Sequence, residues 1–148
     1  MKGKIIMPRY TVLIVDDEKE FREMTVKRLN KRDLECASAP DGDTALAMVA
    51  KNNYDVILLD VKMPGRDGIE ILREIKKMAP LTEVVMLTGH ASVESGINGI
   101  KYGAFDYLMK PIDLEPLFEK LNAAYEQKRA QEAKVEMAQS KRDTARPS

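Results

Sequence analysis

Residues 54–68 read YDVILLDVKMPGRDG, a run of apolar residues that leads into one carboxylate and then cannot continue as a helix. Val56 to Leu59 is continuously apolar, which is typical of a strand buried on both faces of a sheet. Asp60 is the first polar residue after that run. In an open parallel sheet, ligands bind in the crevice at the carboxyl ends of the strands. The stretch therefore predicts a central strand that delivers Asp60 to a binding site.

Composition limits the classes of function that fit the chain. The 148 residues, 44% hydrophobic and 32% charged, are suited to one soluble globular domain. Basic and acidic residues number 24 each, so we expect neither direct nucleic-acid binding nor membrane binding. The amino end lacks a signal-peptide core, and no stretch approaches the roughly 18 apolar residues of a membrane span. A single cysteine, Cys36, cannot form an internal disulfide, and together these features favour a cytoplasmic protein.

Apolar periodicity predicts five strands that alternate with five helices. The expected strands are residues 10–15, 34–39, 56–59, 83–87 and 104–109. Val93, Ile97 and Ile100 mark the fourth helix, which we expect to be the loosest element. Its two internal glycines, Gly96 and Gly99, each cost about 1 kcal/mol relative to alanine. The alternation without repeats favours an α/β fold with a doubly wound parallel sheet.

Polar residues follow four of the five predicted strands, namely Asp16 and Asp17, Asp60, Thr88 and Lys110. Because the carboxyl ends of parallel strands meet at one edge of a sheet, we expect these side chains to converge. Three crowded carboxylates repel one another, and a hard cation such as Mg²⁺ relieves that repulsion through oxygen ligands. The same groups suit phosphoryl transfer, with Asp60 as the nucleophile, Lys110 beside a phosphoryl oxygen and Thr88 as a hydrogen-bond donor.

Each of these residues also has an ordinary structural explanation. Asp16 or Asp17 could be the N-cap of the helix that follows the first strand. That explanation fails for Asp60, because residues 61–64, VKMP, cannot open a helix. Lys110 alone could be a solvated lysine before a turn. Only convergence with Asp60 favours a site.

Four motifs together resemble the receiver domain of bacterial two-component response regulators. They are VDDE at 15–18, LLDVKMPGRDG at 58–68, LTGHAS at 87–92 and YLMKPID at 107–113. The resemblance covers about Tyr10 to Tyr125 and implies a flavodoxin-like fold with strand order 2-1-3-4-5. The sequence of residues 89–113 most resembles the receiver sequences of sigma-54-dependent regulators.

The resemblance implies a chemical role for each acidic residue. Asp60 would accept a phosphoryl group from a sensor histidine kinase. Mg²⁺ would be held by Asp16, Asp17, Asp60 and the backbone carbonyl of Lys62. The domain would be a signalling phosphoprotein rather than an enzyme, catalysing only its own phosphorylation and dephosphorylation.

The resemblance also implies which residues transmit phosphorylation of Asp60 to the surface of the domain. Thr88 and Tyr107 would be the switch pair, and Lys110 would precede a cis peptide bond to Pro111. His90 would modulate the access of water to the phosphoaspartate. The surface of the fourth helix, fifth strand and fifth helix would then change and control a partner protein or output domain.

Three segments are expected along the chain. They are an N-terminal extension at 1–9, a receiver domain at 10–126 and an exposed helical extension or linker at 127–148 that frays toward Pro147. The heptad pattern of the extension loses apolarity halfway, which leaves a homodimer on phosphorylation open. The chain is either a stand-alone receiver or the amino-terminal part of a longer regulator.

Two other classes of function stay open. One is a receiver-fold interaction module that works without phosphorylation. The other is an aspartate-nucleophile phosphatase, although Lys62 occupies the position where such enzymes usually carry a second aspartate. Steady turnover of a small phosphoester would distinguish the phosphatase.

Overall fold

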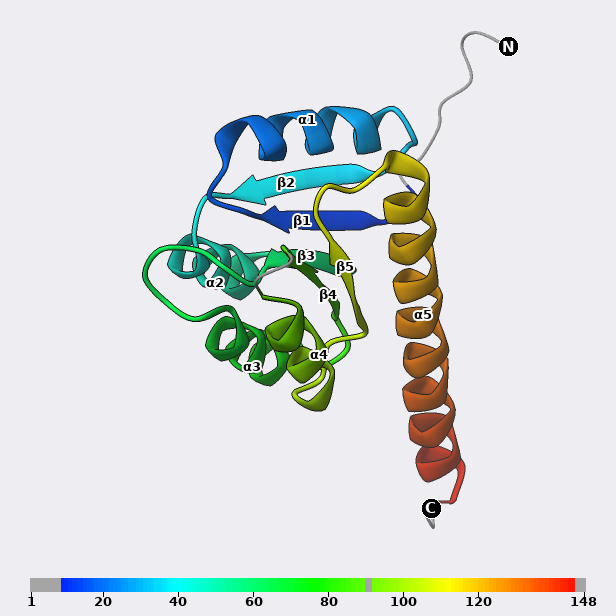
Figure 1. The fold of residues 1–148 in the computed structure, drawn as a ribbon. Helices are drawn as coiled ribbons and strands as arrows, with labels where there is room; N and C mark the ends of the chain where they lie inside the picture. The colour runs from blue at the N-terminus through cyan, green and yellow to red at the C-terminus, as the bar shows by residue number, and fades with distance from the viewer. Residues whose placement is uncertain (1–8, 90–91, 146–148) are drawn as a thin grey trace, which may run out of the picture.

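The computed structural model describes residues 9–89 and 92–145, which form a five-stranded sheet with helices on both faces (Figure 1). The strands are β1 (Thr11–Val15), β2 (Glu35–Ala39), β3 (Val56–Asp60), β4 (Glu83–Thr88) and β5 (Asp106–Met109). The helices are α1 (Lys19–Asn30), α2 (Gly42–Lys51), α3 (Gly68–Met78), α4 (Val93–Lys101) and α5 (Leu114–Ala145). All neighbouring strands are parallel, in the order β2-β1-β3-β4-β5. The predicted flavodoxin-like α/β fold with five helices is confirmed.

Two hydrophobic cores lie on opposite faces of the sheet, because alternate residues of each inner strand point to opposite sides. Ile57 and Leu59 of β3 pack in one core with α2 and α3, and α4 lies over the same face. Val56 and Leu58 pack in the other core with α1 and α5. All five residues of β3 are buried. The continuous apolar run at 56–59 therefore reflects a strand covered on both faces.

Two aspartates cap helices, but neither belongs to the acidic pair after β1. The Asp41 side chain accepts a hydrogen bond from the Thr44 N–H at the start of α2, and Asp67 caps α3 in the same way. The N-cap of α1 is Glu18, whose side chain makes no capping hydrogen bond. The alternative that Asp16 or Asp17 is the N-cap of this helix is therefore wrong.

The fourth predicted helix forms, but its two isoleucines face outward. Ile97 and Ile100 are 48% and 45% exposed, whereas Gly96 and Gly99 are buried against the sheet. A Cβ atom on Gly99 would lie 2.9 Å from Met86 Cγ. The close approach of helix to sheet leaves no room for a larger residue on the inner face, and the isoleucines therefore occupy the outer face.

The fifth helix continues well past the sheet (Figure 1). Its first turns bury Leu117, Leu121 and Ala124, and from residue 133 to residue 143 every side chain is exposed. The division into segments 1–9, 10–126 and 127–148 stays a prediction, and residues 1–8 and 146–148 lie outside the described part of the chain. None of the described helices is both long and apolar enough to cross a membrane.

Candidate functional site

Three carboxylates meet at the carboxyl ends of β1 and β3. One oxygen atom from each of Asp16, Asp17 and Asp60 lies within 4.8 Å of the others. The cause is strand register, because Val15 pairs with Leu59 in the parallel ladder and Asp16 therefore lies next to Asp60. Asp16 and Asp60 are buried and Asp17 is exposed. The structure thus brings together the three aspartates that the sequence predicts to converge.

The ammonium group of Lys110 lies among these carboxylates. Its Nζ atom is 2.7 Å from Asp16 Oδ2, 2.7 Å from Glu18 Oε1 and 3.7 Å from Asp60 Oδ2. The Phe21 ring covers the same ammonium, with 4.6 Å between Nζ and the ring centroid. The site therefore combines a carboxylate cluster with one fixed cation at its edge.

The backbone around the site holds the carboxylates in place. Asp16 Oδ1 accepts a hydrogen bond of 2.8 Å from the Glu18 N–H, and Asp60 Oδ1 accepts one of 3.1 Å from the Lys62 N–H. The Arg22 guanidinium donates to the Asp16 carbonyl at 2.8 Å. The peptide bond between Lys110 and Pro111 is cis, as the resemblance implies.

One oxygen atom of the cluster is left without a hydrogen bond. Asp16 Oδ2 is buried and accepts no hydrogen bond from the described residues, since its contact with Lys110 is an ion pair without hydrogen-bond geometry. Buried polar atoms in proteins nearly always have a partner. The Lys110 ammonium, 2.7 Å away, is its partner here, and a hard divalent cation would be a second one, because the all-oxygen donor set fits Mg²⁺.

Burial and charge set the protonation of the site. The pKa of Asp60 is raised to about 7, first because burial disfavours the charged carboxylate and second because Asp16 repels it. Burial alone would lower the pKa of Lys110, but contacts with Asp16 and Glu18 raise it, so this side chain stays an ammonium. A bound cation would favour the ionised form of Asp60.

Thr88 ends β4 with its hydroxyl group turned toward the following loop. The side chain is fully buried. Its hydroxyl donates a 2.8 Å hydrogen bond to the Gly89 carbonyl and accepts one of 3.4 Å from Ser92 Oγ. Tyr107 is partly buried and packs against the core next to it. The predicted role of His90 concerns a residue outside the described part of the chain.

Sequence reasoning missed three residues that shape this site: Glu18, Phe21 and Ser92. Glu18 is the N-cap of α1, and Phe21 lies in its first turn. Both follow Asp16 by five residues or fewer, and this short spacing could have indicated that they lie near the end of β1. Ser92 follows Thr88 by four residues in the LTGHAS motif, and its hydroxyl forms hydrogen bonds with the backbone of Gly89. No local pattern distinguishes it from an ordinary helix cap.

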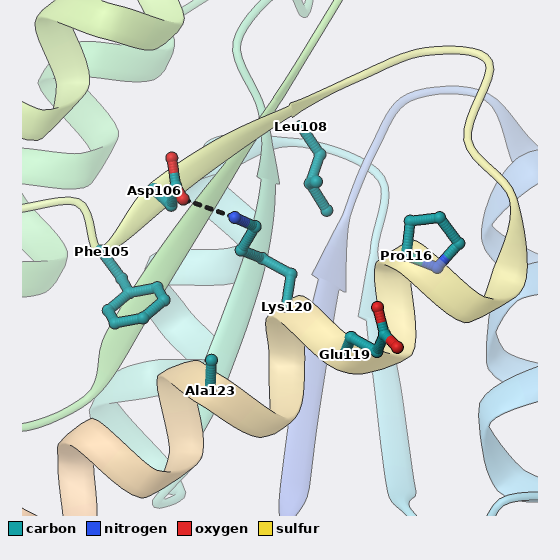
Figure 2. Close-up of a pocket in the computed structure, with 7 residues that line it drawn as sticks. All are labelled: Phe105, Asp106, Leu108, Pro116, Glu119, Lys120 and Ala123. Carbon is teal, nitrogen blue, oxygen red and sulfur yellow. Dashed lines mark hydrogen bonds and ion pairs between the residues drawn. The ribbon is translucent and has the colours of Figure 1, made fainter.

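A separate groove of about 400 Å³ lies between β5 and α5 (Figure 2). Its lining residues are Phe105, Asp106, Leu108, Pro116, Glu119, Lys120 and Ala123. Figure 2 shows Lys120 reaching across the groove, where its Nζ donates to Asp106 Oδ2 at 2.5 Å. None of the acidic site residues lines it, so the groove belongs to the β5 and α5 surface.

The doubly wound sheet with carboxylates at the carboxyl ends of its inner strands defines a flavodoxin-like domain with a candidate cation site. The family model of the response regulator receiver domain matches residues 12–122. The chain belongs to this family, which is a family of signalling domains in two-component systems.

Similar proteins include transcriptional regulators and isolated receiver domains. The DNA-binding transcriptional regulator NtrC of Salmonella typhimurium is 36% identical over 109 residues, which are 74% of this chain and 23% of NtrC. Regulatory protein AtoC of Escherichia coli is 40% identical over 106 residues, 72% of this chain and 23% of AtoC. Both are sigma-54-dependent response regulators, so the predicted resemblance is confirmed. The chain spans about a quarter of the length of these curated relatives.

Solved structures agree with this assignment. NtrX from Brucella abortus in complex with ADP matches with a TM-score of 0.82 and 31% identity, covering 86% of this chain and 30% of NtrX. The receiver domain of the Francisella response regulator 1452 matches with a TM-score of 0.73 and 34% identity, covering 80% of this chain and 98% of that domain.

Proposed function

We propose that this chain is a phosphorylation-dependent switch in which Asp60 accepts a phosphoryl group from a sensor histidine kinase. The observation that carries the proposal is the position of the Asp60 carboxylate, beside Asp16 and Asp17 and 3.7 Å from the Lys110 ammonium. The family assignment supports a signalling role rather than that of a conventional enzyme.

Asp16, Asp17, Asp60 and the Lys62 carbonyl would hold Mg²⁺, which would neutralise charge on the phosphoryl oxygens when bound. Asp60 acts as the nucleophile: its carboxylate oxygen forms a bond to phosphorus while the bond from phosphorus to the kinase histidine nitrogen breaks. In the metal-free protein the pKa of Asp60 is raised to about 7, so part of the population is protonated at neutral pH, and a bound cation would favour the carboxylate that attacks. Lys110 then turns from Glu18 toward a phosphoryl oxygen.

The switch follows from the added charge. A phosphoryl group on Asp60 offers acceptor oxygens, and the Thr88 hydroxyl leaves the Gly89 carbonyl to donate to one of them. Tyr107 moves into the space that Thr88 vacates. The surface of α4, β5 and α5 changes with it, and this surface acts on an output domain or target protein.

The output itself is proposed from the relatives. NtrC and AtoC are about four times as long as the matched region, and NtrC is named as a DNA-binding regulator. We place the output of this protein in a separate domain or partner, with segment 10–126 as the receiver and segment 127–148 as the connection. A homodimer on phosphorylation is a further proposal, which sedimentation with and without phosphodonor would test.

The direct test is to incubate the chain with Mg²⁺ and acetyl phosphate and to measure its intact mass. We expect the mass of one phosphoryl group on the native chain and on Asp43→Asn, whose side chain is exposed and pairs with Arg66. Asp60→Asn should gain none. Equal labelling of Asp60→Asn contradicts the proposal. Steady hydrolysis of a small phosphoester would favour a phosphatase, and partner binding that ignores phosphodonor would favour an interaction module.

A further inference from the structure

Helix α4 meets the sheet at a glycine that lies directly over both proposed switch residues. A Cβ atom on Gly96 would lie 2.7 Å from Thr88 Cγ2 and 3.3 Å from Tyr107 Cβ. Carbon atoms in ordinary contact are about 3.5 to 4.0 Å apart. A side chain at position 96 therefore cannot coexist with the present positions of α4 and the Thr88 methyl group.

The contact also explains why a helix interior contains a residue that disfavours helix. Glycine costs about 1 kcal/mol relative to alanine inside a helix. Gly96 is nevertheless buried on the inner face, while Ile97 is exposed beside it. The sequence of α4 therefore has a residue of low helix propensity at a position that faces Thr88 and Tyr107.

The Thr88 side chain is branched at Cβ, so its hydroxyl and methyl groups turn together about one bond. In the present arrangement the hydroxyl donates to the Gly89 carbonyl and the methyl group lies against Gly96. Of the two other staggered positions, the one that carries the methyl group to the present place of the hydroxyl leaves only the Cβ hydrogen facing Gly96. The space above this glycine is thus occupied in the resting arrangement of Thr88 and vacated when the hydroxyl turns.

We propose that Gly96 is a positioning residue of the switch, because its missing side chain provides the space that holds the Thr88 methyl group in the resting arrangement. The inference rests on the proposed function, since it assigns Gly96 to the Thr88 switch. A methyl group at position 96 would meet Thr88 Cγ2 at 2.7 Å in the resting arrangement, whereas after Thr88 has turned it would itself take up part of the space that Tyr107 otherwise fills. It would therefore raise the free energy of the resting arrangement more than that of the turned one. By linkage, a phosphoryl group that favours the turned arrangement would then bind more tightly.

The test compares Gly96→Ala with Gly99→Ala by titration with beryllofluoride, a mimic of the phosphoryl group, in the presence of Mg²⁺. Both changes add one methyl group to the inner face of α4 and improve helix propensity equally. The added atom at position 99 meets Met86 and Ala104 instead of the switch residues. We expect Gly96→Ala to tighten beryllofluoride binding about fivefold or more, with little change for Gly99→Ala.

A double-mutant cycle isolates the contact itself. Thr88→Ser removes Cγ2, the atom nearest to the added methyl group, and keeps the hydroxyl. In the Thr88→Ser background the effect of Gly96→Ala on beryllofluoride affinity should shrink toward that of Gly99→Ala. If Gly96→Ala alone does not fold, Thr88→Ser should restore folding to it. Failure of that rescue overturns the inference.

The outcomes separate this inference from the function on which it rests. If the native chain does not bind beryllofluoride in a manner that requires Asp60, the proposed function falls and the inference with it. If the native chain binds and Gly96→Ala behaves like Gly99→Ala, only the inference falls. If the role of Gly96 is purely structural, Gly96→Ala will lower the free energy of unfolding without tightening beryllofluoride binding.

Discussion

Lys110 Nζ lies 2.7 Å from Asp16 Oδ2, and this ion pair joins the carboxyl ends of β5 and β1 across the two strands between them. The ammonium group also contacts Glu18 and approaches Asp60. It therefore offsets, in the protein alone, part of the carboxylate repulsion that a divalent cation would otherwise relieve.

Replacing Lys110 with methionine should tighten Mg²⁺ binding about fivefold or more, because the competing positive charge is removed from the cluster. The same change should slow labelling by acetyl phosphate, since no ammonium is left beside the phosphoryl oxygens. Isothermal titration measures the first effect and intact mass the second. Lys120→Met, which removes the lysine that pairs with Asp106 in the separate groove, is the matched control. Weaker Mg²⁺ binding by Lys110→Met would contradict this account.

Asp17→Asn should lower Mg²⁺ affinity at least tenfold while leaving the fold intact, because this carboxylate is exposed and serves only the cluster. Glu35→Gln, an exposed acid at the start of β2, is the control for overall charge. Equal affinities of the two variants would show that Asp17 does not hold the metal.

Asp60→Asn should stabilise the metal-free protein, and the gain should grow with pH. Because the folded-state pKa of about 7 is higher than that of an unfolded aspartate, the folded chain holds a proton that the unfolded chain releases. The native chain therefore loses stability as pH rises from about 4 to about 7, whereas the asparagine variant does not. Urea unfolding in EDTA at about pH 4.5 and about pH 8 should give a difference on the order of 1 to 3 kcal/mol. A gain that is the same at both pH values would argue against the raised pKa.

Lys128→Met should destabilise the protein by about 1 to 2 kcal/mol, between the values for exposed and buried ion pairs. Lys128 Nζ lies 2.9 Å from Asp55 Oδ1, with side-chain exposures of 13% and 24%. Asp55 also accepts hydrogen bonds from the backbone and hydroxyl of Thr11. Lys134→Met, at an exposed position on the same helix, should change the unfolding free energy by less than about 0.5 kcal/mol. Equal effects of the two variants would show that the pair adds nothing.

The sequence predicts the sheet well because its inner strands are buried on both faces, and such strands appear as uninterrupted apolar runs such as 56–59. It also predicts the aspartate cluster, since a parallel sheet carries the residue after each strand to the same edge. The orientation of α4 could not be predicted, because apolar spacing does not show that two glycines face the sheet in place of isoleucines. The pair between Lys128 and Asp55 is equally hidden, because the two residues lie 73 positions apart along the chain.

The ion pair between Asp55 and Lys128 determines where the end of α5 lies relative to Asp60. Strand β3 presents Asp60 at one end, and the residue just before its other end holds the long helix in place. From Lys128 to Ala145 that helix extends about 25 Å farther, directed away from the acidic edge. The acidic edge around Asp60 and the end of α5 at Ala145 therefore lie at opposite ends of the domain, so a protein docked at Asp60 would leave the end of this helix uncovered.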